Sequence, residues 1–465
     1  MSGPGAMGSA VTGAARRARG STAAGFAAQG LAYALVLTSL PAFEHRYSVG
    51  TGAITVVILL VCAMAAVGTV LADRMARGTG GSRGALTLGL ATLVVALAWV
   101  SSAPAFAAAV VGFLCYGLGL GLVDAGGNMQ AVAVQHAYGR SLLASFHGAF
   151  SAAGIVGALL VSVTSGRWPE RPVIWVLPLG VPVAVAAALL VVRWGWRGAG
   201  GSASLEAVSA GRHVPWRPVL LLGVCVVAYY IADSAVSSWS ALFLDDLRAA
   251  GPVRPLGYAA YLGAGLVTRV LGDRAVQRWG RAAVVRSAGV LGAIAMVGIV
   301  AAHAPWTAVL AFGVTGVLSV VPPLAFSAAG DVAPGAADLV VARLNYFNYV
   351  GVVLGGVLVG AVGTVASLRV GFLVPAVLVL AVPLVAGVVR IPGPGAGGRR
   401  AAATGAVTVA AHGAVTGAAS GAASGAATVS APGSATGAAT GSATGAATGS
   451  ASGSPAGPAS DEAPA

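Results

Sequence analysis

Polar residues interrupt the apolar run that contains residues 117–130, GLGLGLVDAGGNMQ. Asp124 and Asn128 are four residues apart, so a helix would place both side chains on one face. An ionisable group in an apolar run is costly to bury and usually faces a partner or a water-filled cavity. Asp124 is therefore a candidate to bind and release a proton, and Asn128 is a candidate to bind a solute. The alternative for Asp124 is a structural carboxylate that is hydrogen-bonded to a neighbouring helix.

A second polar group lies in the segment IADSAVSSWSALFL, residues 231–244. Asp233 and Ser237 are four residues apart on one helical face, and Trp239 is close to them. A carboxylate and a hydroxyl can bind the hydroxyls of a sugar, while an indole can cover the sugar ring. Asp233 is also a candidate proton carrier. Trp239 has an alternative role as a membrane-interface anchor, because two aspartates mark the nearby helix end.

Four further polar residues are candidates for the same site. His147 titrates near neutral pH, so it is predicted either to relay a proton or to serve as an ordinary hydrogen-bonding residue. Asn345 and Asn348 occupy adjacent positions of one helical face, and their neutral amides suit a hydroxyl-rich solute. Gln29 would complete a ring of polar side chains. The three cysteines fall in separate apolar runs without a Cys/His cluster, so no metal and no cofactor are predicted.

The elements that must position these residues are membrane helices. Of the 465 residues, 57% are hydrophobic and 8% are charged, whereas soluble globular proteins have about 25% charged residues. The net charge is +13, but the arginines form short clusters between apolar runs and not one basic stripe. The composition therefore predicts a multi-pass protein surrounded by the lipid bilayer, with no nucleic-acid partner.

Twelve apolar runs are long enough to predict membrane-spanning helices, because about twenty helical residues cross a bilayer. They cover 24–43, 51–71, 85–101, 105–127, 141–165, 174–193, 217–242, 256–271, 285–302, 306–328, 339–364 and 369–390. The glycines around Asp124 predict close packing of the fourth helix. Pro322 and Pro323 predict a kink in the tenth helix, since proline removes a backbone hydrogen bond.

The twelve runs fall into two groups of six, which predicts five segments. These are an N-terminal segment (1–23), a first six-helix bundle (24–193), a linker (194–216), a second six-helix bundle (217–390) and a disordered Ala/Gly/Ser/Thr-rich tail (391–465). With the N-terminus inside, nineteen arginines fall on the cytoplasmic side and six on the other side. Positive charge accumulates on the cytoplasmic side, so both termini are expected there.

An acidic–basic pair recurs after the second helix of each half, as Asp73-Arg74 in ADRMAR and Asp273-Arg274 in GDRAVQRWGR. The two copies are 200 residues apart, which indicates a parallel repeat. Acid and base at a helix end can pair across helices and stabilise one conformation. The pairs are therefore candidate gating residues, together with Arg278 and Arg281. The alternative is that these charges only set the topology.

With these features the sequence resembles the major facilitator superfamily, whose members have twelve helices in two halves and a Gly/Asp/Arg loop after the second and eighth helices. The copy LGDRAVQRWGRAAVVR matches that loop well, while LADRMARGTGGSRG has a longer basic end. The segments GLGLGLVDAGGNMQAVAV, SFHGAFSAAGIVGA and IADSAVSSWSALFL look closest to the fucose-permease-like, sugar-transporter-like branch. In that branch an acidic residue on the fourth helix is implicated in proton coupling, which by resemblance points to Asp124.

The resemblance implies an all-α membrane protein that moves a sugar or similar small polar solute by alternating access, coupled to protons. It also implies a plasma-membrane protein that works as a monomer. A proton-antiporting exporter of drugs or metabolites is the second interpretation, although it would need a roomy apolar site. A non-transporting membrane sensor or scaffold is the alternative from another class. No enzyme activity is predicted, because no metal cluster or nucleophile–base pair is present in the sequence.

Overall fold

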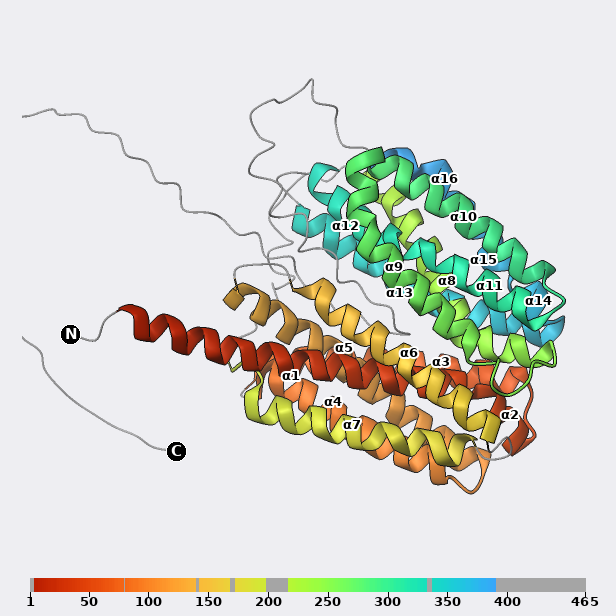
Figure 1. The fold of residues 1–465 in the computed structure, drawn as a ribbon, viewed down its shortest axis with the longest axis horizontal. Helices are drawn as coiled ribbons and strands as arrows, with labels where there is room; N and C mark the ends of the chain where they lie inside the picture. Colours follow the sequence, from red (N-terminus) through yellow and green to blue (C-terminus); the bar gives the residue numbers. More distant parts are fainter. Residues whose placement is uncertain are drawn as a thin grey trace, which may run out of the picture. The chain divides into compact units, whose positions relative to one another are not determined.

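The first half of the chain is helical throughout its described part. The computed structural model describes residues 4–78, 80–138, 142–167, 172–197, 216–332 and 337–389. The helices of this half are α1 (Pro4–Thr38), α2 (Leu40–Tyr47), α3 (Thr51–Arg77), α4 (Gly81–Ser102), α5 (Phe106–Tyr138), α6 (Leu143–Arg167) and α7 (Pro172–Trp194). Figure 1 draws them in red to yellow. The predicted tail and most of the predicted linker lie outside the described residues.

The second half continues with helices only, among the residues described. They are α8 (Trp216–Asp246), α9 (Leu256–Trp279), α10 (Arg281–Ala301), α11 (Pro305–Thr315), the 3-10 segment η2 (Gly316–Val320), α12 (Val321–Val332), α13 (Ala337–Val365), α14 (Leu368–Gly371), α15 (Leu373–Val379), α16 (Ala381–Val385) and the 3-10 segment η3 (Ala386–Val389). Figure 1 draws this half in green to blue.

Ten helical stretches of the described chain are long and apolar enough to cross a membrane. They include α11 to α12 as one stretch and α14 to η3 as another. The two remaining predicted spans are α9, which carries Arg269 in its middle, and α13, of which Val350–Val365 is a shorter apolar stretch. The structure is therefore an all-α membrane fold in which the twelve predicted spans, some of them made of several labelled helices, follow one another in the predicted order.

Several helices extend beyond the predicted apolar runs. α1 begins at Pro4, although the prediction placed its start at residue 24, and it ends at Thr38, before Pro41 opens the short α2. α3 continues to Arg77 and α9 to Trp279, past the predicted ends at 71 and 271. Hydropathy marks only the apolar part of a helix, whereas alanine and arginine are good helix formers that prolong it into water.

The tenth helix is interrupted just before the two prolines that were predicted to kink it. The α-helical pattern stops at Thr315, and a 3-10 segment leads into α12, which contains Pro322 and Pro323. Neither proline has an N–H to donate, so the carbonyls of Leu318 and Ser319 lose their usual partners four residues later. The chain changes to the tighter 3-10 pattern over these residues.

The glycines of α5 bring its backbone against two neighbouring helices. A methyl group on Gly117 would lie 2.5 Å from the Val61 carbonyl oxygen of α3. A methyl group on Gly126 would lie 2.6 Å from the Leu86 amide nitrogen of α4. Both distances are too short for a real side chain, so these positions require glycine. The predicted role of the glycines in close helix packing is thus confirmed, and it leaves Asp124 as the polar feature to explain.

The two halves contact each other through α3 against α13 and through α6 against α9. A methyl group on Gly52 of α3 would lie 3.1 Å from Thr364 of α13, and one on Gly154 of α6 would lie 2.8 Å from Leu262 of α9. α3 and α9 begin, and α6 and α13 finish, at the end of the helices predicted to lie outside the cell, here called the outer end. These contacts between the halves extend from the outer end towards the middle of the helices.

Candidate functional site

Asp233 on α8 is a buried carboxyl group with two tyrosine partners. Its side chain is only 4% exposed. The hydroxyl of Tyr229, one helical turn earlier, donates to Oδ1 at 3.4 Å, and the hydroxyl of Tyr261 on α9 donates to the same oxygen. Burying a charged or polar group is costly unless it is hydrogen-bonded. The two hydroxyls therefore stabilise the carboxyl group between α8 and α9.

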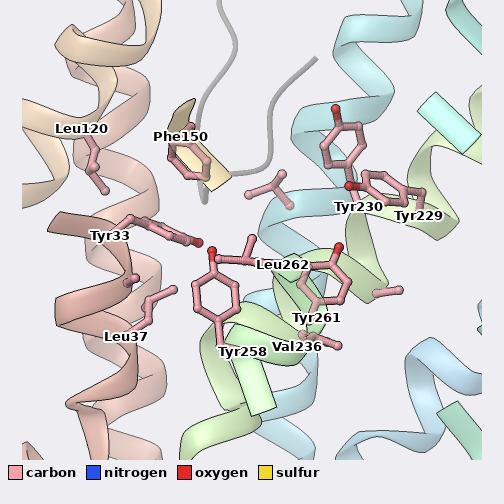
Figure 2. Packing of buried hydrophobic residues seen from close by; sticks show 14 of the residues in the cluster. Tyr33, Leu37, Leu120, Phe150, Tyr229, Tyr230, Val236, Tyr258, Tyr261 and Leu262 are labelled. Carbon is pink, nitrogen blue, oxygen red and sulfur yellow. The ribbon is translucent and has the colours of Figure 1, made fainter. Parts of the chain in front are cut away.

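Further tyrosines surround this carboxyl group, and together they form what we call the tyrosine cluster: Tyr33, Tyr229, Tyr230, Tyr258 and Tyr261 (Figure 2). The Tyr258 ring stacks on Tyr261 with centroids 6.3 Å apart and meets the Tyr33 ring at 6.3 Å. The Tyr33 hydroxyl and the Ser237 Oγ are 3.3 Å apart, which joins α1 of the first half to α8 of the second. The structure thus brings Ser237 into the tyrosine cluster.

The tyrosine cluster was not predicted from the sequence. Tyr229 and Tyr230 precede the carboxylate of α8 by four and three residues, so helical spacing could have identified them. The other three tyrosines come from α1 and α9, and no local pattern connects them to Asp233.

Asp124 on α5 faces α1, where Gln29 Nε2 donates to its Oδ1 at 3.3 Å. Both side chains are buried. Tyr230 meets Tyr229 edge-on, with ring centroids 4.8 Å apart, and it interacts electrostatically with Asp124 as well as with Asp233. The two predicted acids, one in each half of the chain, therefore both lie near Tyr230.

Two of the predicted amides are buried with unsatisfied atoms. The Oδ1 of Asn128 and both amide atoms of Asn348 have no hydrogen-bond partner among the described residues. Buried polar atoms normally have such a partner. These amides therefore offer hydrogen-bonding capacity that a bound solute can satisfy. Asn345 lies on α13, and its side chain is outside the described residues.

The remaining two candidates of the central site are packed against aromatic or backbone groups. The His147 ring meets the Phe26 ring edge-on at 5.1 Å. The Trp239 indole N–H donates to the Gly356 carbonyl at 2.8 Å, and the ring is fully buried against Gly360. This burial gives Trp239 a helix-packing contact and does not fit an anchor at the membrane surface. Contact of His147 or Trp239 with a solute stays a prediction.

The candidate gating residues lie at helix ends and not in loops. Asp73 and Arg74 belong to the last turns of α3, and Arg274 belongs to the last turns of α9. Gly280, with a φ of +80°, separates α9 from α10. Arg281 opens α10, Arg278 stacks over the Trp279 ring at 5.7 Å, and the Asp273 side chain is outside the described residues. The gating role of this set stays a prediction.

A buried amide holds the end of α7 against α4 and α5. The Gln130 Nε2 donates to Ser82 Oγ at 2.8 Å and to the Trp196 carbonyl at 3.1 Å, while Gln130 Oε1 accepts from the Trp196 amide at 2.8 Å. Arg83 Nε donates to the Val191 carbonyl at 3.1 Å. Gln130 therefore has a structural role: its side chain fixes the position of the residues at which the predicted linker begins.

The partners of Arg269 were also not predicted from the sequence. It lies in the middle of α9, and its Nη1 donates to Ser151 Oγ on α6 at 3.2 Å. It also interacts electrostatically with Tyr229 and with Asp233. A cation in the middle of a membrane helix needs such partners.

Charged residues also join the two halves at the outer end. Asp245 of α8 accepts from His45 of α2 and from Arg254, both at 2.8 Å. Glu44, next to this group, is half-buried. Burial, and then the negative charges of Asp246 and Asp245, raise the pKa of Glu44 to about 7. Within the described ranges no group of three or more His, Cys, Asp or Glu side chains is arranged to hold a metal ion.

Solved structures of transporters share this fold. A variant of the nucleoside transporter NupG superposes with a TM-score of 0.64 at 11% identity, over 80% of this chain and 99% of that one. The major facilitator superfamily transporter FucP, in its outward conformation, superposes with a TM-score of 0.53 at 14% identity, over 80% of this chain and 99% of that one.

Sequence relatives lead to the same family, although no family model matches the chain. The uncharacterized transporter y4wD of Sinorhizobium fredii is 26% identical over 379 residues, covering 79% of this chain and 97% of the relative. An uncharacterized MFS-type transporter of Yersinia pestis is 31% identical over 276 residues, covering 58% of this chain and 70% of the relative. The chain therefore belongs to the major facilitator superfamily of transporters.

Proposed function

We propose that this transporter moves a small hydroxylated solute of the sugar class together with protons. The observation that carries the proposal is the buried Asp233 carboxyl group, which two tyrosine hydroxyls hold beside the contact between the halves. A carboxyl group near the middle of a membrane-spanning helix can bind a proton from one side of the membrane and release it to the other side. Alternating access of the two halves would couple that step to solute movement.

The charges around the tyrosine cluster support a neutral solute. Asp124, Asp233 and Arg269 sum to one negative charge when all three are ionised, and one bound proton makes the sum zero. A neutral solute carried with one proton leaves no unpaired charge in a region where an unpaired charge is costly. An organic anion is therefore a disfavoured cargo.

The side chains at the site support a ring-shaped solute with several hydroxyls. Tyrosine rings offer flat apolar faces together with hydroxyl groups. Asn128 and Asn348 contribute unsatisfied amide atoms. Because the structural neighbour NupG is a nucleoside transporter, nucleosides belong beside sugars and polyols among the solutes to test.

The remaining predictions complete the proposal. Asn345 and His147 contribute to the solute or proton path, and the acidic–basic ends of α3 and α9 act as gates. The transporter lies in the plasma membrane with both termini in the cytoplasm and works as a monomer. The segments 194–216 and 391–465 are a linker and a tail.

Transport in proteoliposomes with an imposed pH gradient tests the proposal. Uptake of sugars, polyols, nucleosides and lipophilic drugs is compared in inside-alkaline and inside-acid vesicles, for the wild type, Asp124→Asn and Asp233→Asn. Asp246→Asn, at the outer end of the same helix as Asp233, is the matched control. We expect accumulation of one hydroxylated solute in inside-alkaline vesicles, lost in the first two variants and retained in the control.

Two results would contradict the proposal. Accumulation of drugs only in inside-acid vesicles would indicate a proton-antiporting exporter. Flux of a sugar that is equal in both kinds of vesicle, and unchanged by both central substitutions, would indicate transport without protons.

A further inference from the structure

Arg269 occupies a position where one side chain can contact both halves of the transporter. It is half-buried in the middle of α9, and its Nη1 donates to Ser151 Oγ at 3.2 Å. Ser151 is fully buried on α6. α6 and α9 are one of the helix pairs that join the halves. The hydrogen bond therefore lies within the contact that must change when the halves move.

The same guanidinium also acts on the surroundings of Asp233. The Tyr229 hydroxyl donates to Asp233 Oδ1 at 3.4 Å, and Arg269 interacts electrostatically with both this tyrosine and the carboxyl group. Arginine has five N–H donors in a fixed plane, so one guanidinium can lie between two acceptors, but a movement towards one of them draws it away from the other. An ionised carboxylate is a much stronger acceptor than a serine hydroxyl. The two acceptors, one in each half, thus compete for one cation.

We propose that Arg269 couples the charge on Asp233 to the contact between the halves. With Asp233 neutral, the guanidinium is available to Ser151, and the hydrogen bond between them holds α9 against α6. With Asp233 ionised, the guanidinium is drawn towards the carboxylate and the bond to Ser151 is lost, which releases the outer end. Arg269 is a positioning residue in this scheme, since it acts on the halves through Asp233 and Ser151. The inference rests on the proposed proton coupling.

Other titratable groups around Asp233 in the described chain are mainly phenols. They are Tyr229 and Tyr230 on α8, Tyr258 and Tyr261 on α9, and Tyr33 on α1, with Asp124 of α5 acting on Tyr230. Glu44 and His45 of α2 approach α8 at its outer end, beside Asp245. The phenols keep their protons through the neutral pH range, so the charge of this layer is carried by its carboxyl groups and by Arg269.

The distance between the halves at the outer end, measured against pH, tests the proposal. Spin labels are attached at Ser102, where α4 ends, and at Ala250, after α8, once Cys62, Cys115 and Cys225 have been replaced by alanine. Both label sites are exposed. In the wild-type protein we expect the wider distance to become more populated as the pH rises. In Asp233→Asn the narrower distance should predominate at every pH.

Ser151→Ala removes the acceptor in the first half and leaves the charges untouched. We expect the ratio of wide to narrow populations to increase roughly tenfold at low pH, the usual size of one hydrogen bond to a charged group. Ser145→Ala is the matched control, because its hydroxyl bonds the Leu142 carbonyl of its own segment at 2.7 Å. Arg269→Lys keeps the positive charge but lacks the planar guanidinium, so the distance between the labels should respond less to pH. This variant provides the test if Arg269→Gln does not fold.

The results separate this inference from the proposed function. A wide-to-narrow ratio in Ser151→Ala that equals the ratio in Ser145→Ala would overturn the role of Arg269, even if proton-coupled uptake persists. A pH-dependent distance that shifts in Ser151→Ala, with no proton-coupled flux in vesicles, would support the role of Arg269 and contradict the function proposed above.

Discussion

Replacing Glu44 by glutamine should make the stability of the transporter less sensitive to pH. Glu44 lies on α2 at the outer end, with its Oε1 buried and without a hydrogen-bond partner among the described residues. Burial and the nearby negative charges of Asp246 and Asp245 raise its pKa from 4.5 to about 7. Glutamine has nearly the same shape and carries no charge, so the substitution removes the titration while retaining the packing.

The sign of the change in stability with pH follows from which state, folded or unfolded, binds the Glu44 proton more tightly. The folded protein holds the Glu44 proton to a higher pH than the unfolded chain does. Its stabilising contribution is therefore complete below about pH 4.5 and is lost as the pH rises through about 7. The full difference between the two pKa values corresponds to at most ~3.4 kcal/mol. Water reaches part of the side chain and screens it, so we expect about 1–2 kcal/mol.

Thermal unfolding of the purified protein in detergent, followed by tryptophan fluorescence between pH 5 and pH 8.5, measures this effect. The wild type should lose a few degrees of melting temperature over that range. Glu44→Gln should match the wild type at pH 5 and exceed it at pH 8.5. His45→Gln is the control, because it removes the neighbouring titratable group and should preserve the loss. A pH dependence that persists in Glu44→Gln and vanishes in His45→Gln would refute the reasoning.

Three further substitutions test other parts of the structure. Trp239→Phe removes the indole N–H that donates to the Gly356 carbonyl and should cost about 0.5–1.5 kcal/mol in stability. Loss of solute uptake at an unchanged melting temperature would instead place Trp239 in the site. Gly117→Leu forces a side chain against the backbone of α3 and should reduce the yield of monodisperse protein, whereas Gly148→Ala, with open space around it, should not. Gln130→Ala should speed tryptic cleavage just after α7, and equal cleavage rates would remove its assigned role.

Sequence reasoning succeeded where the signal is local. The twelve helices and the packing glycines of α5 follow from patterns within single runs of residues. The pairing of Asp233 with Tyr261 does not, because the partner comes from another helix and its register depends on packing. The bond between Arg269 and Ser151 joins residues 118 positions apart. Such contacts are set by how the two halves meet, which no run of residues encodes by itself.

Helix ends were the other weakness of the sequence analysis, for a related physical reason. Hydropathy reports where a chain lies in lipid, while helix formation depends on backbone hydrogen bonds that continue into water. α1 therefore begins well before its apolar run. Asp73 and Arg74, expected in a loop, are held in fixed register by the end of α3.

The backbone contacts of α5 make the mechanical stiffness of the molecule uneven. Where a helix touches α3 and α4 through glycine, no side chain is present to change rotamer and absorb a displacement. These three helices must therefore move as one body. The 3-10 segment between α11 and α12 is the opposite case, since its weaker hydrogen bonds allow bending at low cost. We therefore expect thermal motion to bend the second half at this 3-10 segment, while α3, α4 and α5 of the first half move as one rigid unit.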